Sequence, residues 1–172
     1  MDRFIQKIAK AAGAAVLKKF GKVGVKYMKS EALWDCVTEA DLISDRLMVS
    51  AIKKKYPDHG IISEESGSHN PDADYVWIID PIDGTFNFSI GVPQFGVMVC
   101  LAYRGDIVLS AIDLPATKEF FFAKNRKGSV PKREENPLLI HETTAQLFRR
   151  GLFKYTSAHL EISPEACSSV ES

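Results

Sequence analysis

The sequence predicts an α+β fold, a layered α/β sandwich in which two helices flank a mostly antiparallel sheet. Two observations predict it. Residues 4–56 carry helical periodicity, and residues 60–123 consist mainly of short apolar runs separated by turn residues. Helices followed by a run of strands are typical of α+β layering and not of a strict βαβ repeat.

The first expected helix covers residues 4–20. Apolar side chains recur there at helical spacing, beginning with Phe4 and Ile5, as they do on a helix with one buried face. Gly21 ends this helix. A short extended piece, VGVKYM, follows it.

The second expected helix begins with a capping-box pattern. Thr38 is followed by Asp41 three residues later, so that each side chain can bond the backbone of the other. Residues 42–52 supply one apolar face, and Tyr56-Pro57 ends the helix.

The strands are expected in the middle of the chain. GIIS (60–63) and YVWII (75–79) are short apolar runs. Residues 94–115 indicate two strands joined by a turn at residues 104–106, and KEFFFA (118–123) indicates a third strand of that meander.

We expect two parts: an α+β domain over residues 1–128 and a divergent tail over residues 129–172. The tail begins with a polar, structure-breaking stretch, KGSVPKREENP. Residues 138–153 could form one more short helix, and the end of the chain has the composition of a frayed terminus.

Composition narrows the class of protein. The formal net charge is zero, which gives no electrostatic reason to expect a nucleic-acid partner. No run of 18 apolar residues predicts a membrane span. The three cysteines form no CxxC pair, which indicates a reduced, cytoplasmic protein.

Acidic residues directly follow the first two apolar runs. Glu64 and Glu65 follow the first, and Asp80 and Asp83 are at the end of the second. If these strands lie side by side, Glu64 approaches Asp80, and unpaired carboxylates at that distance push one another toward protonation. A hard cation such as Mg²⁺, which prefers oxygen ligands, removes the conflict. The pattern therefore predicts a magnesium site.

Gly84-Thr85 adds a candidate phosphate site. If Asp83-Gly84-Thr85 begins a short helix, its free N–H groups can bind a phosphate, and the Thr85 hydroxyl can orient a water. Each feature has a plainer interpretation. Asp83-Gly84 is also a common hairpin turn, Asp41 can serve only as a helix cap, and Glu64-Glu65 can be a solvated strand end.

The combination is more specific than its parts. DPIDGTFNF (80–88), preceded by WII, with SEES (63–66) and VTEAD (37–41) upstream, resembles the inositol monophosphatase family of Mg²⁺-dependent, lithium-inhibited phosphatases. The resemblance runs from residue 1 to about residue 128. It implies hydrolysis of a phosphate monoester, inositol monophosphate or a related sugar phosphate, by metal-activated water.

The resemblance also implies metal ligands. Glu64 would bind the first metal, and Asp80 would bridge two metals. The backbone carbonyl of Ile82 would complete the first metal site, and Asp83 would bind the second metal. Glu65 would lie just outside these ligands.

Further roles follow for the phosphate and the water. Thr85, with Glu64, would position the nucleophilic water, and the amides of Gly84 and Thr85 would hold the phosphate. Asp41 would support Thr85 by hydrogen bonding. Lys29 lies near the family's loop lysine, although the gap from it to Asp41 is one residue longer here.

The chain departs from the family pattern in two places. Phe86 stands where the family often has a second threonine. Residues 129–172 lack the W-D-x-A-A-type motif whose aspartate completes the second metal site. A truncated, non-catalytic metal-binding remnant that acts as a binding or regulatory partner is therefore the alternative. The family's habit of forming dimers makes a homodimer a candidate assembly.

Overall fold

The computed structural model describes residues 1–31 and 36–124. Its elements are, in chain order, α1 (Asp2–Lys19), β1 (Val25–Met28), β2 (Cys36–Thr38), α2 (Glu39–Lys55), β3 (Gly60–Ser63), β4 (Gly67–His69), β5 (Tyr75–Asp83), α3 (Thr85–Ser89), β6 (Gly96–Tyr103), β7 (Asp106–Leu114) and β8 (Glu119–Lys124). The helix expected at 138–153 and the boundary at residue 128 lie outside the described residues.

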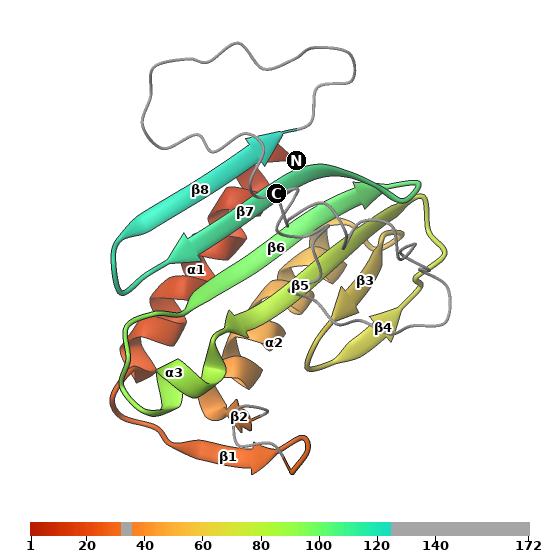
Figure 1. Cartoon of the computed structure of the whole chain (residues 1–172). Helices are drawn as coiled ribbons and strands as arrows, with labels where there is room; N and C mark the ends of the chain where they lie inside the picture. Colours follow the sequence, from red (N-terminus) through yellow and green to blue (C-terminus); the bar gives the residue numbers. More distant parts are fainter. Residues whose placement is uncertain (32–35, 125–172) are drawn as a thin grey trace, which may run out of the picture.

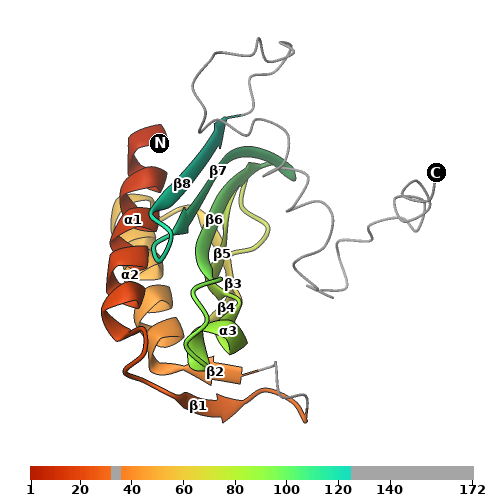
Figure 2. The ribbon, with the colours of Figure 1, turned by 60° about the vertical axis from the view of Figure 1, so that its left-hand side comes forward.

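The described part of the chain forms two layers. Helices α1 and α2 lie on one face of a six-stranded sheet with the order β4-β3-β5-β6-β7-β8, as Figures 1 and 2 show from two sides. Strands β1 and β2 form a separate two-stranded sheet below it in Figure 1. The prediction of a layered α+β fold with two flanking helices is confirmed.

The main sheet is mixed, and this corrects the expectation of a mostly antiparallel sheet. Strands β3 and β5 are parallel, with Ile61 opposite Trp77 and Ser63 opposite Ile79. The other neighbouring pairs in that sheet are antiparallel. The parallel pair has a physical cause: after β3 the chain forms the short strand β4 and returns to the same end, so β5 runs in the direction of β3.

The core lies between the helices and the sheet. Helix α1 buries one face, which includes Ile5, Ile8 and Val16, as its periodicity predicts. These residues share one cluster with Trp77 and Ile79 of the sheet. Because α1 packs on β6 and β7 and α2 packs on β5, the two helices cover the middle of the sheet.

Helix α2 begins as the capping box predicts. The Thr38 backbone N–H donates to Asp41 Oδ2 at 2.8 Å, and the Ala40 N–H donates to Thr38 Oγ1 at 3.2 Å. The helix buries Met48 and Ile52, as expected, but it also buries polar side chains on the turn that faces the end of β5. The interior between α2 and the carboxyl end of β5 is therefore polar.

None of the helices in residues 1–31 and 36–124 is long and apolar enough to cross a bilayer.

Candidate active site

The predicted acidic residues meet at the carboxyl ends of β3 and β5. The register places Ser63 opposite Ile79, so that Glu64 and Asp80 follow at the same level. The Glu64 backbone N–H donates to the Ile79 carbonyl at 3.2 Å and continues the ladder. The expectation that the two strand ends lie together is confirmed.

Asp80 is the most constrained member of the cluster. Its side chain is only 5% exposed, and its Oδ1 atom is buried without a hydrogen-bond donor among the described residues. Burial raises the pKa of Asp80 well above its ordinary value, and the negative charges of Glu64 and Asp83 raise it further. A buried carboxylate oxygen without a donor is costly unless a cation or proton meets it.

Two neighbouring carboxylates share this environment. Burial raises the pKa of Asp83, and the charge of Glu64 adds to the effect. Burial also raises the pKa of Glu65, although its hydrogen bond to Lys29 opposes the shift. The cluster thus holds more negative charge than its surroundings compensate.

Lys29 is the cation that the described residues bring to the cluster. Its Nζ atom donates to Glu64 Oε1 and to Glu65 Oε1, each at 2.7 Å. Burial of the ammonium group opposes protonation, but these two hydrogen bonds raise the pKa of Lys29. The sequence resemblance assigned this lysine to the site, and the structure brings it there directly after strand β1.

Thr85 and Asp41 are joined as the resemblance implies. The Thr85 hydroxyl lies 3.0 Å from Asp41 Oδ1 and 2.8 Å from the Ile82 carbonyl oxygen. Asp41 Oδ2 accepts from the Thr38 hydroxyl at 2.5 Å. Burial raises the pKa of Asp41, and the hydrogen bonds from Thr38 and Thr85 oppose that shift. The Asp41 carboxylate therefore both caps helix α2 and accepts the hydrogen bond of Thr85.

Gly84 begins a short helix and not a hairpin turn. It is the N-cap of α3, with φ of 81°, a left-handed conformation that side chains disfavour. A Cβ atom on Gly84 would lie 2.8 Å from the carbonyl oxygen of Gln94. The turn interpretation of Asp83-Gly84 is wrong, and the interpretation as a helix start is confirmed.

The sequence patterns do not reveal a set of serine hydrogen bonds between helix α2 and the residues at the ends of β3 and β5. Ser63 and Ser66 donate to Asp45 Oδ1, and Ser44 donates to the Pro81 carbonyl at 2.9 Å. These bonds fasten α2 to the ends of β3 and β5. The available signal was the serine on each side of Glu64-Glu65, which the apolar pattern ignores.

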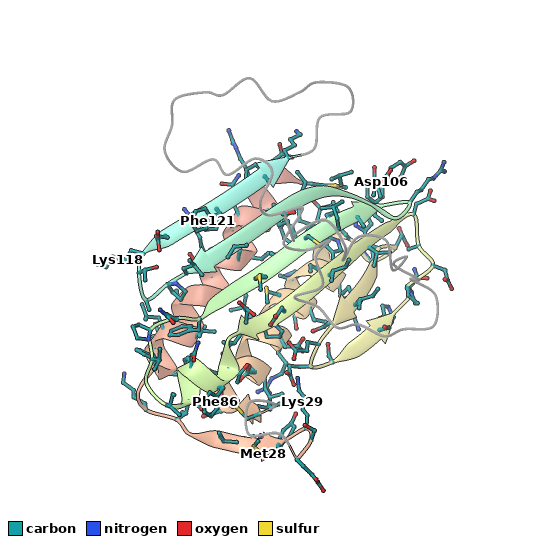
Figure 3. The ribbon with its side chains drawn as sticks, in the orientation of Figure 1. Met28, Lys29, Phe86, Asp106, Lys118 and Phe121 are labelled. Carbon is teal, nitrogen blue, oxygen red and sulfur yellow. The ribbon has the colours of Figure 1, made fainter. Side chains whose placement is uncertain are left out.

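Phe86, on α3, and Lys29, which directly follows β1, lie at the same end of the molecule (Figure 3). Phe86 is 38% exposed. Helix α3 packs against β2, which pairs with β1. An apolar side chain therefore occupies the position where the resemblance leads us to expect a threonine.

The donor set fits a hard divalent cation. Its members are oxygen atoms, and one of them, Asp80 Oδ1, has no hydrogen-bond donor within the described part of the chain, as expected for an atom that can bind a metal. Within residues 1–31 and 36–124, however, no three His, Cys, Asp or Glu side chains already form a metal-binding group. Lys29 instead contacts two of the carboxylates.

Comparison with known proteins decides the family, because the inositol monophosphatase family model matches residues 1–168. The chain belongs to the inositol monophosphatase family. Its curated relatives include the Nus factor SuhB of Pseudomonas aeruginosa, 35% identical over 124 residues, and a histidinol-phosphatase of Chlorobaculum parvum, 38% identical over 122 residues.

Solved structures of the family agree. The inositol monophosphatase of Thermotoga maritima aligns with a TM-score of 0.67 at 33% identity and covers 79% of this chain and 55% of its own. The SuhB protein of Bartonella henselae aligns with a TM-score of 0.67 at 31% identity and covers 74% of this chain and 49% of its own.

The chain spans about half the length of the curated relatives it matches. The alignments cover 70% and 71% of this chain but 46% and 47% of the SuhB and histidinol-phosphatase relatives. Family membership supports a phosphatase-like hydrolase. The relatives carry both phosphatase and Nus factor names, so the name of a relative does not by itself assign an activity.

Proposed function

We propose that this chain contributes to Mg²⁺-dependent hydrolysis of a phosphate monoester, inositol monophosphate or a related sugar phosphate. The observation that carries the proposal is the buried Asp80 oxygen without a donor, beside two further carboxylates at the ends of parallel strands. At neutral pH such an arrangement is costly unless a cation or a proton compensates the negative charge. Family membership supports phosphate chemistry at that cation.

Four residues would hold the metal. The carboxylates of Glu64, Asp80 and Asp83 and the carbonyl of Ile82 are the proposed ligands. When bound, Mg²⁺ would polarise the phosphoryl oxygens and lower the pKa of the attacking water. Glu65, bonded to Lys29, would lie outside this set and keep the lysine in place.

The remaining roles belong to the start of α3. A Thr85 hydroxyl that donates to Asp41 has lone pairs left to accept a hydrogen bond from the attacking water. With Glu64, it would aim that water at phosphorus. The backbone amides of Gly84 and Thr85 would hold the phosphate, and Gly84 lets the ester approach the backbone.

The test is release of inorganic phosphate from inositol monophosphate by the purified full chain, with and without Mg²⁺ and with Li⁺ as inhibitor. We expect Mg²⁺-dependent, Li⁺-sensitive release. Asp80→Asn should abolish it while circular dichroism shows an intact fold, because the amide removes a charged metal ligand and keeps the shape. Full activity of Asp80→Asn would contradict the assignment of the site.

A second candidate function is non-catalytic: the chain binds one metal and acts as a binding or regulatory partner. One observation favours it: several of the relatives are named Nus factors and not phosphatases. This candidate predicts that calorimetry detects Mg²⁺ binding while no ester is hydrolysed.

The assembly separates the two candidates further. A homodimer or a complex with a longer relative would place residues of a second chain beside this site. Analytical ultracentrifugation with an activity assay on each species decides the point. An active, stable monomer counts against the regulatory candidate, whereas activity confined to a dimer or complex indicates that a partner completes the site. Neither candidate requires a nucleic-acid partner or a membrane.

A further inference from the structure

His59 lies at the opposite end of β3 and β5 from the carboxylates. The Trp77 indole Nε1–H donates to His59 Nδ1 at 3.0 Å. The imidazole also stacks on Tyr56 and on Tyr75, with centroid distances of 4.8 and 4.9 Å and interplanar angles of 15°. The Trp77 side chain is fully buried. A titratable group thus accepts the hydrogen bond of a buried indole.

This contact fixes the chemical state of His59. An indole N–H can only donate, so Nδ1 must present its lone pair and the ring proton must be on Nε2. Burial lowers the pKa of His59, and the nearby charge of Asp58 opposes that shift. Lys55 lies over the neighbouring Tyr56 ring at 5.6 Å and adds a positive charge near the stack. The neutral imidazole is therefore the form that fits.

The bond joins the two strands that carry the acidic cluster. His59 directly precedes β3, and Glu64 directly follows it; Trp77 lies on β5, three residues before Asp80. Strand β3 has only four residues, and all four pair with β5. Its other neighbour, β4, is a three-residue strand with every residue exposed. The position of β3 therefore depends mainly on its contacts with β5.

We propose that His59 is a positioning residue for the acidic cluster: its imidazole, bonded to Trp77, holds the start of β3 on β5 so that Glu64 and Asp80 emerge at the same level. The part of this inference that concerns Mg²⁺ rests on the proposed function. The part that concerns the strand register does not, because the Glu64 N–H bond to the Ile79 carbonyl reports the register directly.

Two substitutions separate the hydrogen bond from the stacking. His59→Phe keeps a ring for the stack but removes the acceptor. His59→Asn offers an oxygen near the place of Nδ1 and cannot become charged. His69→Phe is the matched control, because His69 is exposed on β4 and pairs with Ile61 of the same strand β3.

The readouts are amide hydrogen exchange of Glu64, relative to Val99 in the buried strand β6, and Mg²⁺ affinity by calorimetry. Loss of the bond should speed Glu64 exchange and weaken Mg²⁺ binding about tenfold in His59→Phe. His59→Asn should restore both to near the wild-type values. A role in stability alone would change the exchange of Val99 by the same factor.

Each outcome either supports or refutes the positioning role of His59. A folded His59→Phe variant with wild-type Glu64 exchange overturns the proposal, as does His59→Asn behaving like His59→Phe. If the wild-type chain binds no Mg²⁺, the proposed metal function is wrong. The exchange rate of the Glu64 amide still tests whether His59 positions strand β3. If His59→Phe does not fold, Trp77→Phe replaces it, since it removes the donor, and unchanged Glu64 exchange there also refutes the proposal.

Discussion

The two ends of strand β5 differ in how their polar groups are satisfied. At its start, the Trp77 N–H has the His59 nitrogen as partner, and the surrounding rings stack in pairs. At its end, Asp80 has a buried oxygen without a donor, and the neighbouring carboxylates repel it. At one end of the strand the polar groups are therefore satisfied within the chain, whereas at the other a buried carboxylate oxygen has no donor among the described residues.

This difference distinguishes groups that stabilise the fold from groups that the proposed function uses. Groups at the start of β5 meet their partners within the chain, so ligands should not affect them. Under the proposed function, Asp80 at the other end gains a partner when a cation binds, so the stability of the acidic cluster should depend on Mg²⁺ and on pH. The comparison can be tested by substitutions at the acidic end and at matched positions elsewhere.

The largest expected effect is that of Asp80→Asn on stability with and without metal. Because the pKa of Asp80 is raised, the metal-free folded chain binds its proton more tightly than the unfolded chain does. The stability that this group contributes is therefore lost as pH rises from the unfolded pKa, about 3.9, through the raised folded value. At pH 7 without Mg²⁺, the variant should be more stable by about 1–3 kcal/mol.

Mg²⁺ should reverse that order. Saturating Mg²⁺ stabilises whatever state binds it, so it should raise the unfolding midpoint of the wild type and leave that of Asp80→Asn almost unchanged. Chemical denaturation at pH 5 and pH 7, with Mg²⁺ or with EDTA, measures all four cases. Equal stabilisation of both proteins by Mg²⁺ would place the metal somewhere other than Asp80.

Gly84→Ala should be the next most damaging change. The variant combines a left-handed φ with a Cβ only 2.8 Å from the Gln94 carbonyl, and such strain costs about 1–3 kcal/mol. The start of α3 should shift, and phosphate release should fall with it. Gly91→Ala is the control, because Gly91 has φ of 80° but no atom within 4 Å of the added Cβ.

Thermal unfolding and phosphate release of both glycine variants separate the two causes. Gly91→Ala should lose about 1 kcal/mol from the left-handed backbone alone and keep its turnover. If the two variants lose equal stability and equal turnover, the close approach at Gly84 has no specific role.

Asp113→Asn tests whether a buried carboxylate outside the cluster behaves differently. Burial raises the pKa of Asp113 to about 6, with Lys10 opposing the shift, and a Cβ on Gly13 would lie 1.8 Å from its Oδ2 atom. Its contribution to stability is lost as pH rises from about 4 to 6. The variant should therefore gain about 2 kcal/mol at pH 8 and almost nothing at pH 4.

Mg²⁺ distinguishes Asp113 from Asp80. Denaturation curves of Asp113→Asn should show the same stabilisation by Mg²⁺ as those of the wild type, since this carboxylate faces α1 and not the cluster. If Asp113→Asn abolished the Mg²⁺ effect, the metal would not be confined to the acidic end of β5.

Much of this site could be predicted from the sequence because its signals are local. The capping box of Thr38 and Asp41 lies within four residues, and the apolar runs before Glu64 and Asp80 indicate where the two strands end. The motif resemblance supplied Ile82 and Lys29, which no local pattern marks. The metal and phosphate assignments themselves remain predictions.

The rest depends on contacts between distant segments. Helical periodicity favours apolar positions on α2 and therefore overlooks the buried Ser44 and Asp45, whose partners lie on other elements. Strand β4, GSH, is exposed and shows no alternation that could reveal it. No pattern in the sequence marks His59, because nothing there shows that Trp77 donates a hydrogen bond to it.

Lys29→Gln should have the smallest effect of these changes and the opposite sign on metal binding. The Lys29 ammonium group lies 2.7 Å from oxygens of Glu64 and Glu65 and therefore competes with a cation for Glu64. Its removal should tighten Mg²⁺ binding roughly three- to tenfold, and salt should shrink the difference. Phosphate binding should weaken, because Lys29 is a positive charge in direct contact with the cluster.

Calorimetry at low and at high salt measures the effect, with Lys26→Gln, on the strand β1 that precedes Lys29, as the control. Lys26 is exposed and has no resolved contact with the acidic residues, so its substitution should change Mg²⁺ affinity little. If Lys29→Gln weakened Mg²⁺ binding, the lysine would serve to organise Glu64 and not to replace the metal. The acidic end of β5 would then resemble its start in being satisfied from within the chain.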